Sequence, residues 1–312
     1  MAIQSPKAAS ELMRQGSEIA WSLAGMSYPN TGSPLYALAA NRVRIAHGGW
    51  SDQDFAFQFE ALRGLVGVTT SQVLGLADMC DSSSKIWIHP IMTVIRGMAE
   101  ASGLLMWILE PWVAPHGVDE EVFDEDWNTL SIPTLARSQL LMIDSLSDRV
   151  RRRRADGNED SASNDLEWLN TEIVRVSALD DSKRTRLSGK RREEWMILGE
   201  KLPSRTGQVV RATEYSYGQD ARYSGMNPYP MLSGHAHASL DVVFAYTLKQ
   251  VTTQFSDLLL VKDDEIHRAT SLGLRILAAT MDFFSNACGG ARRDLDVWTE
   301  ASDQYVLSAQ HS

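Results

Sequence analysis

The sequence has almost no cysteine: Cys80 and Cys288 are the only two among 312 residues, and they lie far apart. A disulfide framework or a zinc knuckle needs several closely spaced cysteines, so the sequence excludes both. Long apolar runs are missing too. The uncharged stretch of residues 64–77 is too short to cross a bilayer, and glycine, proline, serine and histidine interrupt that of residues 223–240. We therefore expect no membrane passage and, for want of any metal motif, no cofactor.

The first 25 residues lack the unbroken apolar run of an export signal, because Lys7, Glu11, Arg14 and Glu18 divide them. They fit an amphipathic helix instead. A cytoplasmic location is the resulting expectation.

Excess positive charge is also lacking, since 40 acidic and 30 basic residues give a net charge of −10. This charge disfavours non-specific binding of nucleic acid by the whole molecule. Residues 149–222 differ, because 16 basic and 13 acidic residues leave a local charge of +3. An anionic partner, nucleic acid included, would have to meet that middle segment.

Alternating β-branched runs are scarce, whereas apolar residues recur at intervals of three and four. This periodicity predicts an all-α protein, an irregular multi-helix bundle. Pro133 after Ser131 indicates a capped helix start, Asp263-Asp264 another start, and Gly289-Gly290 a helix end. The predicted helices cover residues 6–25, 35–47, 52–79, 88–110, 133–154, 163–177, 190–200, 231–260, 264–287 and 291–307.

We interpret residues 1–312 as one helical domain. The segment 151–165 is polar, carries charges of both signs and has no large apolar residue. We therefore expect it to be a surface connection that separates an N-terminal from a C-terminal helical half. A second irregular stretch is expected from Lys201 to Pro230.

Two charged residues interrupt the helix predicted over 88–110, which is apolar around nearly its whole circumference. Arg96 and Glu100 lie one turn apart on the same face, and a lone charge there would be costly. They must pair with each other or with a third group. A structural ion pair and a ligand site both remain open. Arg137 presents the same choice between a snorkelling arginine beside Asp144 and a ligand-binding group.

A polar stripe is expected in the stretch "NPYPMLSGHAHASLDVVFAY", because Tyr229, Ser233, His237 and Asp241 follow one another at intervals of four. Asp241 could accept a hydrogen bond from the ring of His237, and Ser233 could contact its other nitrogen. Ser233 and His237 are therefore candidate catalytic residues. Serine-hydrolase chemistry would still lack an obvious oxyanion hole, and a hydrogen-bonded core histidine is the simpler reading.

Two further groups have a simple structural reading. Arg149 and Arg151–Arg154 are read as the solvated end of a helix, where cations meet the negative pole of the dipole. Asp263 and His267 could share a helix face for a metal, although helix capping explains the carboxylates more simply.

Four segments together resemble a family of helical proteins of unknown function that is common in actinobacteria and is similar in turn to HEPN-like domains. They are "VIRGMAEASGLLMWILEP", "LARSQLLMIDSLSDRVRRRR", "LPSRT" and "YPMLSGHAHASLD", in that order. The resemblance implies a HEPN-like core with additional N- and C-terminal helices. HEPN ribonucleases use Arg-x(4–6)-His, which this chain matches only at Arg42 and His47, with an apolar residue after the arginine.

These observations favour an internal cleft that binds a nucleotide or another small anionic ligand. Its predicted lining consists of Arg96, Glu100, Arg137, Tyr229, Ser233, His237 and Asp241. The alternatives are a non-catalytic helical interaction protein whose buried polar residues are structural, and a HEPN-like ribonuclease. Whether the protein is an enzyme, and whether it forms a homo-oligomer, stay open.

Overall fold

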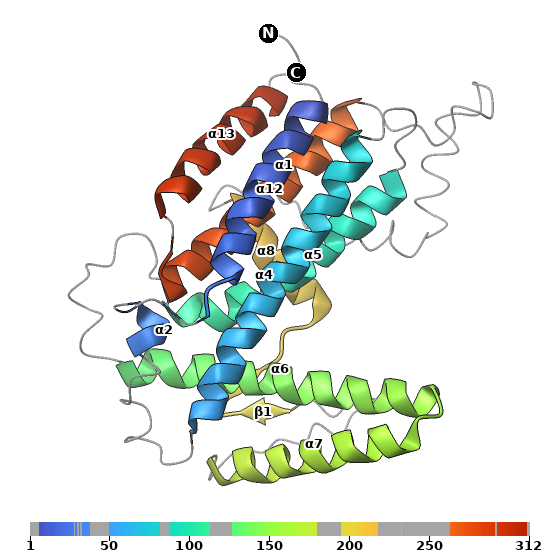
Figure 1. The fold of residues 1–312 in the computed structure, drawn as a ribbon, viewed down its shortest axis with the longest axis vertical. Helices are drawn as coiled ribbons and strands as arrows, with labels where there is room; N and C mark the ends of the chain where they lie inside the picture. Colours follow the sequence, from blue (N-terminus) through green and yellow to red (C-terminus); the bar gives the residue numbers. More distant parts are fainter. Residues whose placement is uncertain are drawn as a thin grey trace. The chain divides into compact units, whose positions relative to one another are not determined.

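The chain is almost wholly helical in the part that the structure describes, as the sequence predicts (Figure 1). This computed structural model describes residues 6–27, 29, 31, 33–37, 50–81, 88–112, 127–179, 195–217, 232, 263–290 and 292–310. The α-helices are α1 (Pro6–Ala24), α2 (Pro34–Ala37), α4 (Asp52–Asp81), α5 (Ile88–Leu109), α6 (Trp127–Ala155), α7 (Glu159–Leu179), α8 (Arg205–Tyr217), α12 (Asp263–Cys288) and α13 (Arg292–Gln310). The 3-10 turn η2 (Glu110–Trp112) follows α5 directly.

The helices form two compact units that are interleaved along the chain. Unit 1 combines residues 1–27, 62–107 and 204–312, and unit 2 combines residues 28–61 and 108–203. The division predicted near residues 151–165 therefore lies inside unit 2.

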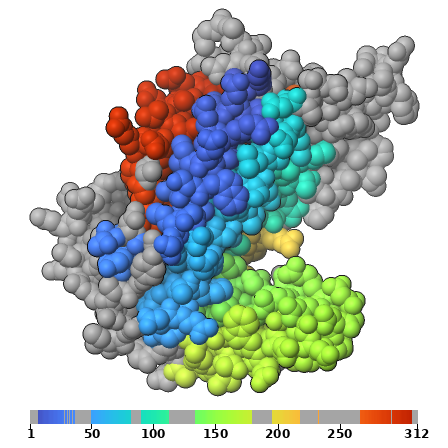
Figure 2. All heavy atoms as spheres, in the orientation of Figure 1, coloured from blue at the N-terminus to red at the C-terminus, as the bar shows by residue number. Residues whose placement is uncertain are grey.

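In unit 1, α1, α12 and α13 pack against one another and α8 packs against α12. Figure 2 shows α1 and α13 on one face of the molecule. Gly16 permits the approach of the C-terminal helices, because a side chain there would overlap Trp298 and Leu277. The indole Nε1 of Trp298 in turn donates to the carbonyl of Leu12 at 2.8 Å. A core glycine and an anchored tryptophan thus tie the two ends of the chain together.

The segment Pro90–Leu109 is the one described stretch that is long and apolar enough to cross a membrane, by length and composition alone. Yet 72% of this window is buried inside the protein, among them the fully buried Ile95, Met98 and Leu105. Such burial is typical of a core helix.

In unit 2, α6 and α7 form an antiparallel helical hairpin joined by the turn Asp156–Asn158. Gly157 has a φ of +73°, which glycine adopts without strain. Its amide donates to the carbonyl of Arg154, and the amide of Asn158 donates to that of Arg153, which is a Schellman motif. The Asn158 side chain then accepts from the amide of Ser161 and caps α7. The surface connection expected over 151–165 is therefore only a three-residue turn, because Asp-Gly-Asn ends one helix and starts the next.

Three predictions of local structure are wrong: the start of one helix, a helix that is a hairpin instead, and an irregular stretch that contains a helix. Helix α6 begins at Trp127, so Pro133 lies in its second turn rather than its first. The helix predicted over 190–200 is instead, from Met196 on, the β-hairpin of β1 (Met196–Ile197) and β2 (Glu200–Lys201). Leu198 and Gly199 both have positive φ, 50° and 83°, which is the geometry of a type I′ turn.

Helix α8 lies within the stretch from Lys201 that was expected to be irregular. Ser204 starts it by accepting the amide of Gly207 on its side chain and the amide of Gln208 on its carbonyl. This helix was not predicted because it contains three weak helix formers, Gly207, Val209 and Val210. Apart from Leu232, the predicted helix 231–260 lies outside the described residues, as do residues 38–47.

Candidate functional site

Arg96 and Glu100 pair with each other, which is one of the two arrangements that the sequence left open. On α5 the Arg96 Nε donates to Glu100 Oε1 at 2.8 Å, and the two side chains are 8% and 24% exposed. The carboxylate thus supplies the counter-charge for an almost fully buried guanidinium. This pair lies in unit 1 and acts within one helix turn.

Arg137 in unit 2 is held by two carboxylates that are distant in sequence. Its Nε and Nη2 donate to Glu200 at 2.8 and 3.3 Å, and its Nη1 donates to Glu110 at 3.4 Å. The expected neighbour Asp144 is not the partner, because β1 and β2 pack against α6 and bring Glu200 to the arginine. Because its guanidinium already donates hydrogen bonds to two carboxylates, Arg137 is poorly suited to bind a further anion.

The predicted cleft stays a prediction. Arg96 and Glu100 belong to unit 1 and Arg137 belongs to unit 2. The remaining predicted lining lies outside the described residues, as does the HEPN-type pair: Tyr229, Ser233, His237, Asp241, Arg42 and His47.

The arginine run at the end of α6 is only partly solvated. Arg149 and Arg153 both pair with Asp165 of α7, at 3.0 and 2.9 Å, and the Asp165 side chain is 8% exposed. Arg149 also lies over the Trp168 ring, 5.4 Å from its centroid. Two arginines of the run therefore cross-link the helical hairpin, which corrects the reading of a purely solvated end.

A buried carboxylate that the sequence analysis did not single out organises unit 2. Asp54 accepts hydrogen bonds from the amide and hydroxyl of Ser51, which is the start of α4, at 2.7 and 2.8 Å. It also accepts from Gln139 of α6 at 2.5 Å and from both terminal nitrogens of Arg175 of α7, at 2.6 and 3.1 Å. Arg175 pairs in addition with Glu172 at 2.7 Å. Asp54 thus joins three helices, and the spacing Ser-x-x-Asp was the signal that could have revealed its capping role.

A second set of polar groups lies along α12 in unit 1. His267, Ser271 and Arg275 follow one another at intervals of four, so they share one side of the helix. Each has a buried atom without a hydrogen-bond partner: His267 Nε2, Ser271 Oγ and Arg275 Nε. His267 is 5% exposed and Ser271 is 7% exposed. We call these three residues the α12 stripe.

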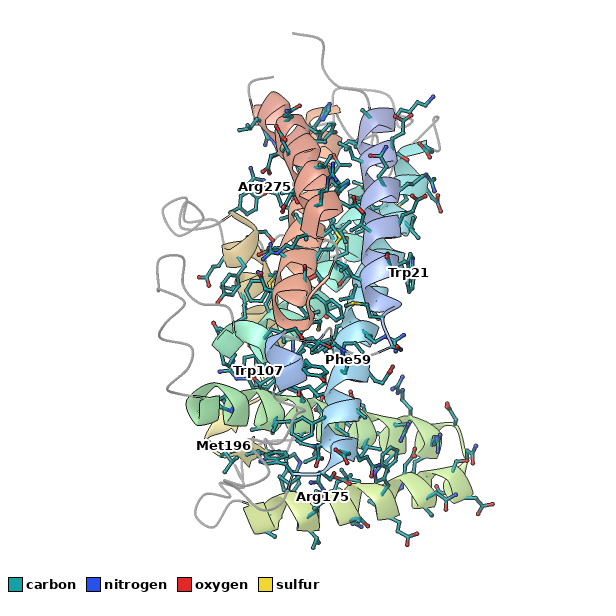
Figure 3. The ribbon with its side chains drawn as sticks, turned by 60° about the vertical axis from the view of Figure 1, so that its left-hand side comes forward. Trp21, Phe59, Trp107, Arg175, Met196 and Arg275 are labelled. Atoms are coloured by element: carbon teal, nitrogen blue, oxygen red, sulfur yellow. The ribbon has the colours of Figure 1, made fainter. Side chains whose placement is uncertain are left out.

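Arg275 differs from the other candidate cations because no carboxylate pairs with it in the part of the chain that the structure describes. Its guanidinium instead lies over the ring of Tyr217 of α8, 4.7 Å from the centroid. Figure 3 labels Arg275. Burial raises the pKa of Tyr217, and the positive charge of Arg275 opposes this rise only in part. The phenol is therefore a neutral neighbour, which supplies no negative charge to the guanidinium.

At the other end of the α12 stripe, His267 is held by α13. Its Nδ1 lies 2.8 Å from the hydroxyl of Tyr305, which is 1% exposed. The same hydroxyl lies 3.3 Å from Thr270, whose own proton goes to the carbonyl of Ile266 at 2.8 Å. The sequence analysis considered His267 only for a metal with Asp263. Within the described residues no group of three or more His, Cys, Asp or Glu side chains is placed to hold a metal ion.

Neither cysteine is a nucleophile at neutral pH. Both thiols are buried, and burial, with the nearby Asp81, raises the pKa of Cys80 to about 11. Burial raises the pKa of Cys288 further still. Because only the thiolate attacks electrophiles, these cysteines are inert core residues.

A shallow, open hollow of about 530 Å³ runs along the outer face of α7. Its described lining consists of Ser163, Leu166, Glu167, Asn170, Thr171 and Val174. None of these residues is a candidate site residue, and all come from one exposed helix face. We therefore do not assign the site there. Comparison of the chain with family models, with curated proteins and with solved structures gave no match.

Proposed function

We propose that the protein binds a small anionic ligand, such as a nucleotide, with the anionic group at Arg275 of α12. The observation that supports this is a guanidinium whose buried Nε has no hydrogen-bond partner and which no described carboxylate neutralises. Arg96 and Arg137 pair with carboxylates instead, Arg96 within its own helix and Arg137 with Glu200 of β2. Desolvating a cation without a counter-charge is costly, so a ligand that supplies negative charge recovers that cost on binding.

Phosphate and carboxylate are the anions that suit this group. A guanidinium presents a planar fork of donors that matches two oxygens of either anion. Tyr217 covers one face of the guanidinium, so the ligand approaches its edge. The hydroxyl of Ser271, one turn away, can donate to the same anion.

The proposal is tested by calorimetric titration of inorganic phosphate and uridine monophosphate into the whole protein. We expect saturable binding to the wild type and at least a tenfold loss of affinity in Arg275→Met, which keeps the length of the side chain. Arg293→Met is the matched control, because Arg293 is an exposed arginine of α13 and its loss changes the net charge equally.

Absence of binding to well-folded wild type would refute the proposal and favour the interaction protein with structural polar networks. The ribonuclease alternative is tested separately on single-stranded RNA with wild type, His47→Ala and His237→Ala. Cleavage that either substitution abolishes would place the activity outside the α12 stripe. We also expect the protein in the cytoplasm, where nucleotides and other phosphorylated metabolites are available.

A further inference from the structure

We infer that the ligand is two-ended: its anionic group meets Arg275, and a neutral hydrogen-bond acceptor meets the Nε2–H of His267. This inference rests on the proposed function and adds the chemical class of the ligand. It also assigns Tyr305 as a positioning residue, which acts on the ligand only through His267.

The hydrogen-bond roles around Tyr305 follow from counting protons. Thr270 donates its only hydroxyl proton to the carbonyl of Ile266. It can therefore only accept a hydrogen bond from Tyr305. Among the described residues, the Tyr305 hydroxyl has one proton and two hydrogen-bond partners that can accept it, at 2.8 Å on His267 and at 3.3 Å on Thr270. The shorter contact takes the proton. We therefore assign Tyr305 as the donor to His267 Nδ1, which places the proton of the neutral imidazole on Nε2.

With this tautomer, every unpartnered buried atom of the α12 stripe belongs to a hydrogen-bond donor. The donors are the imidazole Nε2–H, the Ser271 hydroxyl and the Arg275 Nε–H. A buried donor without a partner costs roughly 1–3 kcal/mol, and three in a row on one helix point to an acceptor-rich occupant.

The two ends of the stripe differ in charge and stand well apart. From His267 to Arg275 the helix rises about 12 Å and turns about 80°. The Arg275 end carries the guanidinium, and the His267 end presents a ring nitrogen next to a phenol and a hydroxyl. An extended ligand with a phosphate or carboxylate at one end and a carbonyl or ring nitrogen at the other fits this pattern. A nucleoside monophosphate has that chemistry.

The test compares inorganic phosphate with uridine monophosphate on four proteins: wild type, His267→Leu, His267→Gln and Tyr305→Phe. We expect His267→Leu to weaken binding of the nucleotide about 5- to 10-fold, as the loss of one hydrogen bond does, and to leave phosphate binding unchanged. His267→Gln restores a donor near the Nε2 position and should recover most of the nucleotide affinity.

Tyr305→Phe should change the tautomer of His267, which it would leave unchanged if Tyr305 had only a structural role. The ¹⁵N chemical shifts of the histidine ring should report the Nε2–H tautomer in wild type and a mixture of tautomers in Tyr305→Phe. Nucleotide affinity should fall in parallel, while phosphate affinity stays constant. Circular dichroism and thermal melting of each variant establish that the fold is retained.

The outcomes separate this inference from the proposed function. If neither phosphate nor nucleotide binds wild type, the proposed function fails. If both bind through Arg275 with equal affinity, and His267→Leu weakens neither or both alike, the proposed function stands and the two-ended ligand is refuted. An Nδ1–H tautomer in wild type would also refute the assignment of Tyr305.

Discussion

Replacing Asp54 by Asn tests whether one buried carboxylate holds unit 2 together. The substitution keeps the shape of the side chain and removes its charge. Asp54 is 3% exposed and receives hydrogen bonds from Ser51, Gln139 and Arg175, so its neighbours are all donors. An asparagine offers one acceptor oxygen to these donors and turns its amide group, itself a donor, toward at least one of them.

The expected cost follows from what remains after the change. Breaking a buried ion pair by removing one partner costs about 3–5 kcal/mol, because the other charge is left uncompensated. Here Arg175 keeps Glu172 at 2.7 Å, and its side chain is 29% exposed. These two facts place the loss near the lower limit, at about 3 kcal/mol.

Urea unfolding followed by circular dichroism measures the change in the free energy of unfolding. Amide hydrogen exchange in α4, α6 and α7 shows whether the loss is confined to unit 2, which matters because a chain of two units need not unfold in one step. The control is Glu167→Gln, an exposed carboxylate on α7 that should change stability by no more than about 0.5 kcal/mol. If Asp54→Asn costs no more than this control, the carboxylate does not organise the unit and the reasoning fails.

Three other predictions follow from single contacts. Glu100→Ala should destabilise the protein by about 3 kcal/mol in urea unfolding, and replacing Arg96 and Glu100 together by Met and Leu should cost less. If the cost of the double substitution equals the sum of the two single costs, the two residues are not coupled as an ion pair. Gly103→Ala should destabilise by about 1–3 kcal/mol, because a methyl group there overlaps the backbone carbonyl of Gln208, whereas Gly64→Ala meets open space and should stabilise by about 0.5–1 kcal/mol; equal effects on the melting temperature would contradict this. Cys80 should resist Ellman's reagent in the folded protein at pH 8. Since burial raises its pKa from the ordinary 9.0 to about 11, the free energy of unfolding should fall as the pH rises from 9 to 11.

The sequence predicted those helices whose apolar periodicity is long and uninterrupted. Helices α1, α4, α5, α12 and α13 were located to within a few residues, because each has ample apolar surface and a clear start or stop, such as Gly289 with φ +72°. Short elements escaped because turn chemistry decides them. Leu198-Gly199 makes a hairpin in a stretch that was read as helical.

The candidate site was less predictable, because the partners of its charges come from far along the chain. The pairing of Arg96 with Glu100 was predictable since both stand on one helix turn. Arg137 pairs with Glu200, 63 positions away, and no local pattern names that partner. The α12 stripe shows the reverse problem, because spacing can reveal His267 and Arg275 as neighbours but cannot reveal that their buried atoms lack partners.

The interleaving of the two units sets an order in which they can be completed during synthesis. The last segment of unit 2 ends at residue 203, whereas unit 1 requires residues 204–312. At the usual 5–20 residues per second, the ribosome needs roughly 5–20 s more to supply that final segment. Until then the apolar face of α1, which α12 and α13 later cover, has no partner helices from the C-terminal end, and Leu76 and Ser102 lack the contacts that α12 later makes with them. The nascent chain is thus exposed to aggregation late in translation, and truncation before α12 should yield a protein that depends on chaperones.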